Sequence, residues 1–273
     1  MENNVQIMPT PYPDLNFVLH DIVASQQQIL CDNFVGAYLQ GSFAVGDFDQ
    51  HSDVDFVIVI ENELSENQVE SLQILHERIF QHETRWAQHL EGTYFSQDDL
   101  RNQSGLGKEF WYLDNGSRSL IQSNHCNTLL VRWVLREYGV TLAGPPPKTL
   151  VDPIPVADLR AEIKGFMIRW AQEIVDNPAT YNNRFYQTYI VLSYCRMLHD
   201  LINGYPGSKR AGAEWAKANL DSSWADLIGR TWDGRPNPAI SVRTPADPVD
   251  FERTLLFVRY ILDQMNNLPA FEK

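Results

Sequence analysis

The sequence predicts an α/β (α+β) domain followed by an all-α helical bundle. Short strand-like runs alternate with helical periodicity in the first part of the chain, whereas the second part shows helical periodicity throughout. Between them lies GPPPKTLVDPIPVADL, residues 144–159, whose five prolines can continue neither a helix nor a central strand. A chain of 273 residues is long enough for two domains. We therefore expect one domain over residues 1–150 and a second over residues 151–273.

The elements of the first domain follow from local patterns. Apolar residues at helical spacing predict helices, β-rich apolar runs predict strands, Ser65 can cap a helix start, and Gly139 can close a helix. In chain order we expect a helix over 14–33, a strand over 35–40, a short helix after Gly41, strands over 52–61 and 87–97 with a helix over 65–81 between them, a helix over 125–139 and a strand over 140–144. Helices and strands thus alternate.

The second domain is predicted to be a helical bundle of about four or five helices. Helical periodicity is clearest in four segments, over residues 157–175, 184–202, 209–220 and 248–265. The tryptophans of these segments are expected to be packing residues.

The charge, cysteine and apolar content of the chain limit the kinds of molecule that it is expected to bind. Lys plus Arg number 22 and Asp plus Glu 35, a net charge of −13 that repels nucleic acid and anionic membranes and suits a cationic small molecule. The three cysteines, Cys31, Cys126 and Cys195, form no CxxC pair, so their spacing suggests neither a disulfide framework nor a zinc site. No apolar run approaches the ~20 residues of a membrane span. We expect a cytoplasmic monomer.

The stretch GSFAVGDFDQHSDVDFVIVIE, residues 41–61, carries the chemistry. A phosphate loop needs a lysine after Gly46, where Asp47 stands, and an EF-hand starting at Asp47 needs glycine at Ser52 and glutamate at Ile58. A nucleophile elbow does not match GSFAVG. These three motifs are therefore excluded.

Two aspartates in this stretch form a candidate metal site. Side chains repeat every two residues along a strand, so Asp53 and Asp55 face the same side and can share hard divalent cations. Gly41 and Ser42 lie where a strand turns into a short helix, and their backbone N–H groups and hydroxyl can hold a polyphosphate. An isolated Asp-x-Asp is more often a turn or a solvated strand end. The preceding Gly-Ser favours a site for a metal-bound nucleotide.

These residues carry a resemblance. GSFAVGDFDQHSDVDFVIVI resembles the GS…DxD signature of the nucleotidyltransferase superfamily, and LEGTYFSQDDL, LAGPPPKTLVDPIPVADL and NGYPGSKRAGAEWAKANL resemble, in order, segments of the aminoglycoside adenylyltransferases that modify streptomycin and spectinomycin. The resemblance implies an amino-terminal domain with a mixed sheet and a helical domain that completes the nucleotide and acceptor site. It implies ATP- and Mg²⁺-dependent transfer of AMP to a small-molecule hydroxyl, with two Mg²⁺ ions and release of pyrophosphate.

The resemblance also assigns roles to residues. Asp53 and Asp55 match metal-binding catalytic residues, and Glu91 matches a third carboxylate, the general base with a share in metal binding. The residues expected to bind the nucleotide are Gly41, Ser42, Ser52, Arg196 and Lys209. An arginine fork and a lysine charge suit the leaving pyrophosphate.

Acceptor recognition is less well defined by the sequence. Trp111 and Tyr112 lie near the family's drug-contacting tryptophan, and Asp114 belongs to a polar loop that can border the same cleft. Tyr186 stands where streptomycin-modifying members carry an acidic residue, which leaves spectinomycin or an unrelated metabolite open. His125, beside a cysteine, is expected to be a helix cap or a satisfied hydrogen-bonding residue rather than a ligand or a catalytic residue.

Two alternatives stay open at this point. The chain can instead place AMP on a protein hydroxyl or on a metabolite, with no antibiotic role. It can also be a nucleotide-binding module without catalysis, although the presence of all three carboxylates argues against this.

Overall fold

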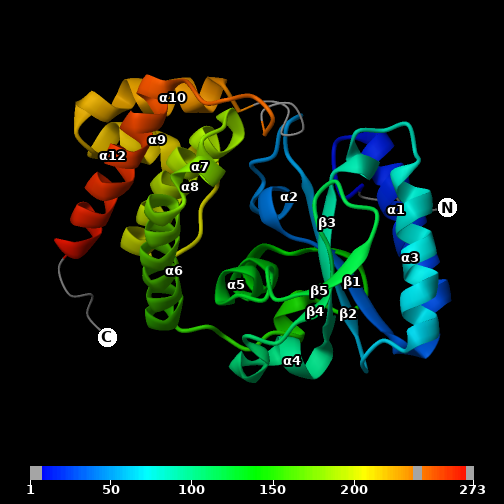
Figure 1. The fold of residues 1–273 in the computed structure, drawn as a ribbon. Helices are drawn as coiled ribbons and strands as arrows, with labels where there is room; N and C mark the ends of the chain where they lie inside the picture. Colours follow the sequence, from blue (N-terminus) through cyan, green and yellow to red (C-terminus); the bar gives the residue numbers. More distant parts are fainter. Residues whose placement is uncertain (1–7, 236–241, 269–273) are drawn as a thin grey trace, which may run out of the picture. The chain divides into compact units, whose positions relative to one another are not determined.

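A computed structural model describes residues 8–235 and 242–268. The chain divides into two compact units, Met1–Pro153 and Ile154–Lys273, which are described separately. Figure 1 shows strands in the first unit and helices in the second. The predicted fold class, a mixed α/β domain followed by an all-α domain, is confirmed. Within the ranges described, no helix is long and apolar enough to cross a membrane.

The first unit is built on one six-stranded mixed sheet. Its strands are β1 (Phe34–Leu39), β2 (Val54–Ile60), β3 (Leu90–Ser96), β4 (Phe110–Leu113), β5 (Leu120–Ser123) and β6 (Val140–Ala143). They lie in the order β5-β4-β3-β2-β1-β6, and the central pair β2–β3 is parallel while the other neighbours are antiparallel. The parallel pair places equivalent residues of β2 and β3 side by side.

Packing against helices shows which face of the sheet each residue of β2 lies on. The helices of this unit are α1 (Pro13–Leu30), α2 (Gly41–Val45), α3 (Glu66–Phe80), α4 (Gln97–Arg101) and α5 (Leu129–Tyr138). The even-numbered residues of β2, from Val54 to Ile60, share a core with buried residues of α1 and α3, which lie together on one side of the strands (Figure 1). The odd-numbered residues therefore face the other side, where α2 and α5 contact each other.

Two strands and one α-helix of the first unit were not predicted. The strands β4 and β5 form a hairpin whose loop contains Asp114, Asn115 and Gly116, and Gly116 has the positive φ of 78° that such a loop requires. The sequence FWYLDNGSRSLIQS carries this hairpin signal. Residues 97–101 form α4, with Ser96 as its cap. The predicted cap at Ser65 is confirmed, and Gln68 completes a capping box with it.

The second unit consists of helices packed around α8. Its described helices are α6 (Val156–Asp176), α7 (Pro178–Tyr181), α8 (Arg184–Asn203), α9 (Lys209–Asn219), α10 (Ala225–Asp233) and α12 (Pro248–Asn266). The helix α8 contacts α6, α9, α10 and α12, and thirteen of its twenty residues are buried. A Cβ on Gly212 of α9 would lie 2.5 Å from the Cα of Arg196, so this glycine allows α9 to approach α8 closely.

A buried polar group lies between the sheet and the helices α1 and α3. The Tyr94 hydroxyl accepts a hydrogen bond from Gln26 Nε2 at 2.9 Å and lies 2.7 Å from His76 Nε2. All three side chains are almost completely buried. Burial lowers the pKa of His76 to about 3, so the imidazole is neutral in the folded protein at ordinary pH.

This histidine makes stability dependent on pH. The unfolded chain binds a proton at His76 near its ordinary pKa of 6.5, while the folded chain does not until about pH 3. Unfolding therefore becomes easier as the pH falls below 6.5. We expect this residue to lower the free energy of unfolding by about 2 kcal/mol between about pH 7 and pH 5. In urea titrations, His76→Gln should have a shallower pH slope, whereas His20→Gln, at an exposed position of α1, should keep the wild-type slope.

Candidate functional site

Three carboxylates converge on the sheet face opposite α1 and α3. Asp53 precedes β2, Asp55 is its second residue, and Glu91 is the second residue of β3, directly beside Asp55 in the parallel pair. Each offers one oxygen, and the three oxygens lie within 4.8 Å of one another. The one-residue spacing and the parallel register together produce the cluster.

A glycine turn leads the chain up to Asp55. Gly41, the first residue of α2, has a φ of 62°, and a Cβ on it would collide with the Asp55 carboxylate. The backbone N–H of Gln40 donates to the Asp55 carbonyl at 3.0 Å and so joins the end of β1 to β2. The Ser42 hydroxyl oxygen is buried and has no hydrogen-bond partner among the described residues, so it retains a proton for an incoming anion.

The loop before β2 is closed by Ser52. Its hydroxyl accepts a hydrogen bond from the backbone N–H of Asp49 at 2.9 Å, and its own N–H donates to the Asp49 carbonyl at 3.0 Å. These bonds fix the turn that delivers Asp53. Nucleotide binding by Ser52 stays a prediction.

Groups from the β4–β5 hairpin hold the carboxylates. The Tyr112 hydroxyl lies 2.7 Å from Glu91 Oε1 and 2.9 Å from Asp114 Oδ1, so its single proton is shared between two carboxylates. Asn115 Nδ2 donates to Asp53 Oδ2 at 3.3 Å. The hairpin loop, with Asp114 and Asn115, therefore borders the cluster of carboxylates.

Burial and neighbouring charges shift the pKa values of residues in and beside the cluster. Burial, and next the charge of Asp53, raise the pKa of Glu91, and the hydrogen bond from Tyr112 opposes this shift. Arg85 is a basic residue that sequence analysis missed, and its charge acts on Asp49 and Asp53. Its guanidinium lies 4.8 Å from the Trp86 ring centroid, and burial lowers its pKa. No sequence pattern marks this arginine, because it lies in the irregular segment between α3 and β3.

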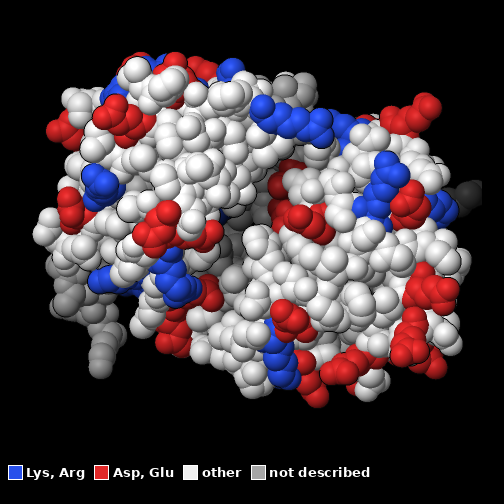
Figure 2. All heavy atoms as spheres, viewed as in Figure 1, with Lys and Arg blue, Asp and Glu red and all other residues white. Residues whose placement is uncertain are grey.

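The donor set fits a hard divalent cation. Three carboxylates offer only oxygen ligands, the type that Mg²⁺ prefers, and they belong to strands that cannot easily move apart. Figure 2 shows acidic and basic side chains interspersed on the face drawn, so acidic surface alone does not distinguish the site. The site is distinguished by the convergence of three half-buried carboxylates, those of Asp53, Asp55 and Glu91.

Trp111 lies on the opposite face of the sheet from Tyr112 and from these carboxylates, and acceptor contact by Trp111 stays a prediction. Successive strand residues face opposite sides, and Trp111 pairs with the core residue Tyr94. Trp111 packs against that core and lines a hollow of about 430 Å³ together with Leu64, Glu66, Val69, Glu70, Gln73 and Leu120. Tyr112, by contrast, contacts Glu91.

The three predicted residues of the second unit lie on α8 and α9. Arg196, on α8, has a buried Nε without a partner among the described residues. Burial raises the pKa of Asp200, and the hydrogen bond with His199 and the charge of Arg196 oppose this rise. Lys209 begins α9, with its Nζ 4.7 Å from the Tyr189 ring centroid. Tyr186 packs against Tyr181, at a centroid distance of 4.9 Å. Nucleotide binding by Arg196 and Lys209 and acceptor contact by Tyr186 stay predictions.

Comparisons with known proteins match a different family model to each of the two units. Residues 24–94 match the family model of the nucleotidyltransferase domain, and residues 149–240 match the model of the C-terminal domain of aminoglycoside adenylyltransferase. Aminoglycoside (3'') (9) adenylyltransferases of Klebsiella pneumoniae and Escherichia coli are 22% identical over 219 residues, covering 77% of this chain and 81% of theirs.

One similar solved structure is a spectinomycin adenyltransferase AAD(9) from Enterococcus faecialis with ATP and spectinomycin. Its TM-score is 0.68 at 13% identity, covering 92% of this chain and 99% of that one. At this identity the likeness concerns the fold.

Two glycines, the first residue of α2 and the residue that follows its end, give a matched test of the turn. Gly41 and Gly46 both have positive φ, so alanine at either position should cost about 1–2 kcal/mol of stability from backbone strain. Only at Gly41 does the new Cβ meet Asp55, because nothing lies within 4 Å of a Cβ on Gly46. We expect Gly41→Ala to weaken Mn²⁺ binding by at least about tenfold and Gly46→Ala to leave it within about twofold, as measured by electron paramagnetic resonance. Equal effects of the two substitutions would contradict this role of the turn.

Proposed function

We propose that this chain, which belongs to the nucleotidyltransferase superfamily and has a C-terminal domain like that of aminoglycoside adenylyltransferases, transfers AMP from ATP to a hydroxyl of an aminoglycoside or aminocyclitol. The observation that carries the proposal is the convergence of Asp53, Asp55 and Glu91 on two adjacent parallel strands. The adjacent turn, where the Ser42 hydroxyl has no partner in the part of the chain that the structure describes, supports it.

The carboxylates are the proposed holders of two Mg²⁺ ions. When bound, Mg²⁺ would neutralise and orient the phosphate oxygens around the reacting phosphorus. Asp53 and Asp55 face the same side with their spacing fixed by β2, and Asn115 holds Asp53 from the hairpin side. These contacts keep the aspartates in position at little entropic cost.

Residues of both units are proposed to bind ATP. The backbone at Gly41 and the Ser42 hydroxyl would hold the triphosphate from the first unit, with Ser52 keeping the loop beside them closed. Arg196 and Lys209 would supply positive charge to the β- and γ-phosphates, which leave as pyrophosphate. The similar structure that contains ATP supports this choice of nucleotide.

Glu91 is the proposed general base. Its raised pKa makes it a better proton acceptor than an exposed carboxylate, and Tyr112 fixes its orientation at a hydrogen-bond distance of 2.7 Å. The acceptor hydroxyl would give its proton to Glu91 as its oxygen bonds to the α-phosphorus, while the bond from that phosphorus to the β-phosphate oxygen breaks. AMP is thereby transferred and pyrophosphate released.

Spectinomycin is the acceptor that the observations favour. The similar relatives and the solved structure concern aminoglycosides and spectinomycin, and the net charge of −13 suits a cationic acceptor. Tyr186 offers an aromatic ring and no carboxylate to a guanidinium-bearing drug such as streptomycin.

The test is pyrophosphate release from ATP and Mg²⁺ with a panel of aminoglycosides and aminocyclitols that includes spectinomycin and streptomycin. Release should occur with spectinomycin. Glu91→Gln should lower kcat by about 10²–10⁴-fold, and Asp53→Asn at least as much. Asp98→Asn, at an exposed position of α4, is the matched control and should retain wild-type activity.

Two results would contradict the proposal in different ways. An Asp53→Asn variant as active as wild type would remove the metal assignment. If ATP binds but no compound of the panel supports release, the antibiotic acceptor is wrong. Transfer of AMP from labelled ATP to lysate proteins or metabolites would then identify the acceptor class.

The basic residues of the second unit give a separate prediction. Arg196→Ala and Lys209→Gln should each lower kcat/KM for ATP by about 10²-fold, because the leaving pyrophosphate loses a compensating charge. Steady-state kinetics at saturating acceptor measure this. Arg169→Ala on α6 and Lys217→Gln on α9, both at exposed positions, should change kcat/KM by less than about twofold. Effects as small as those of the controls would remove Arg196 and Lys209 from the nucleotide site.

A further inference from the structure

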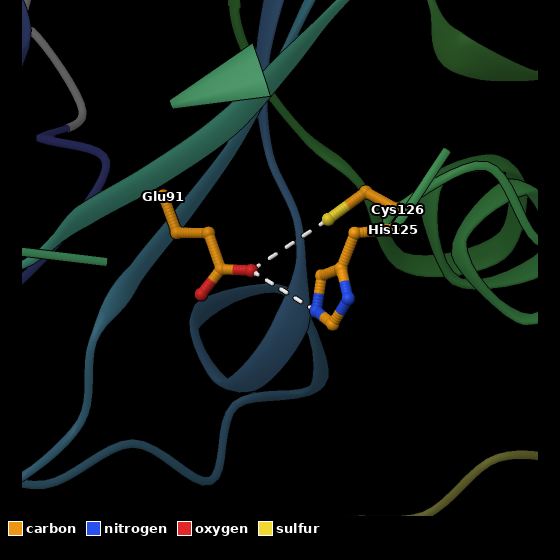
Figure 3. Close-up of side chains that lie close together, drawn as sticks. All are labelled: Glu91, His125 and Cys126. Carbon is orange, nitrogen blue, oxygen red and sulfur yellow. Dashed lines mark hydrogen bonds and ion pairs between the residues drawn. The ribbon is translucent and has the colours of Figure 1, made fainter. Parts of the chain in front are cut away.

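A turn before α5 brings two more potential metal ligands to Glu91. His125 Nε2 lies 3.8 Å and Cys126 Sγ 3.7 Å from the same oxygen, Glu91 Oε1. One ligand atom from each of the three residues lies within 4.8 Å of the others. Figure 3 shows the imidazole and the thiol pointing toward the carboxylate from adjacent positions of the turn.

The turn is anchored independently of these contacts. The N–H of Asn127 donates to the Asn124 carbonyl at 2.9 Å, which places His125 and Cys126 at the two central positions of a tight turn. The Asn127 side chain donates to the carbonyls of Gly105 and Lys108, both at 2.8 Å, and accepts from the buried Arg132 at 2.6 Å. The position of the thiol is therefore fixed by surrounding structure.

Sulfur, imidazole nitrogen and carboxylate oxygen form a donor set typical of zinc. In a tetrahedral Zn²⁺ site the O···N and O···S separations are about 3.4 and 3.6 Å, given metal–ligand distances of about 2.0–2.3 Å. The observed separations of 3.8 and 3.7 Å are close to these values. His125 is exposed and can rotate to complete the set, and three protein ligands leave a fourth position for water.

We propose that Glu91, His125 and Cys126 form a second metal site, for Zn²⁺ or a metal of similar softness, and that metal bound there withdraws Glu91 from the Asp53–Asp55 cluster and inhibits AMP transfer. The binding part stands on geometry alone, whereas the inhibition part rests on the proposed function. Mg²⁺ does not compete well for this site, because it prefers oxygen ligands.

Binding forms the S–Zn bond and releases the proton of the Cys126 thiol to solvent.

Cobalt provides a direct probe of this site, because Co²⁺ bound to a thiolate gives a sulfur-to-metal charge-transfer band. The Cys31→Ser variant is the background, since Cys31 is an exposed thiol that can bind metal by itself. Co²⁺ titration of this variant should produce the band, and Zn²⁺ should abolish it. Adding Cys126→Ser should remove the band. Adding His125→Gln, at an exposed position that does not endanger folding, should weaken Co²⁺ affinity by at least about tenfold.

Absence of the band in the Cys31→Ser protein would overturn the metal site, as would a band that survives Cys126→Ser. Unchanged affinity in His125→Gln would overturn the three-ligand arrangement. These readouts need neither ATP nor acceptor, so they stand even if the proposed function fails.

Inhibition is tested separately. With excess Mg²⁺, Zn²⁺ should inhibit pyrophosphate release by the Cys31→Ser enzyme, and adding Cys126→Ser should raise the Zn²⁺ concentration for half-inhibition by at least about tenfold, each relative to that variant's own metal-free rate. The inhibitory role would be overturned if both variants showed the same Zn²⁺ concentration for half-inhibition while the optical titration showed Zn²⁺ bound to the Cys31→Ser protein. The binding site itself would then remain in place.

Discussion

The placement of three carboxylates within 4.8 Å of one another is the constraint on which the rest of the first unit depends. Two carboxylates about 4 Å apart near a protein surface repel by about 4 kcal/mol, while a typical hydrogen bond contributes only about 1 kcal/mol. The hydrogen bonds from Tyr112 and Asn115 therefore offset part of the repulsion between the carboxylates. The nearby positive charge of Arg85 offsets a further part. The arrangement becomes favourable when a cation is added, which is what a metal-dependent site requires.

The topology explains how polar groups reach this point. The carboxylates lie at the starts of two parallel strands, whereas ligands of open α/β sheets usually bind at the carboxyl ends. Here each parallel strand has an antiparallel neighbour that ends where it begins: Leu39 of β1 lies opposite Phe56, and Leu113 of β4 lies opposite Gly92. The turns that follow these two neighbours deliver the Gly41 backbone and the Asn115 side chain to the cluster. The mixed sheet is thus necessary for the site.

Sequence patterns predicted the parts of the molecule that depend on local periodicity. The helix α3 with its capping serine, the strand β2 and the helices α6 and α8 were all expected near their observed positions. Side-chain alternation correctly placed Asp53 and Asp55 on one face, and the resemblance to a known family singled out Glu91.

What was missed depends on contacts between distant segments. The register that sets Glu91 beside Asp55 is a property of strand pairing, which one sequence does not reveal. The β4–β5 hairpin was not predicted, and without its strands Trp111 and Tyr112 could not be assigned to opposite faces. Arg85 reaches the aspartates from an irregular segment, and its approach has no periodic signature.

Glu91 joins two donor sets with different chemical preferences. Toward Asp53 and Asp55 it completes an oxygen-only set that suits Mg²⁺, and toward His125 and Cys126 it completes a mixed set that suits softer metals. Because one carboxylate cannot serve both sets fully, the occupant of either side alters the other. The spacing of the cysteines gave no hint of this, since Cys126 and Glu91 are 35 residues apart and meet only through the sheet and the turn before α5. A serine at residue 126 would preserve most of the packing and remove the soft ligand, so the thiol is the atom on which the difference between the two sets depends.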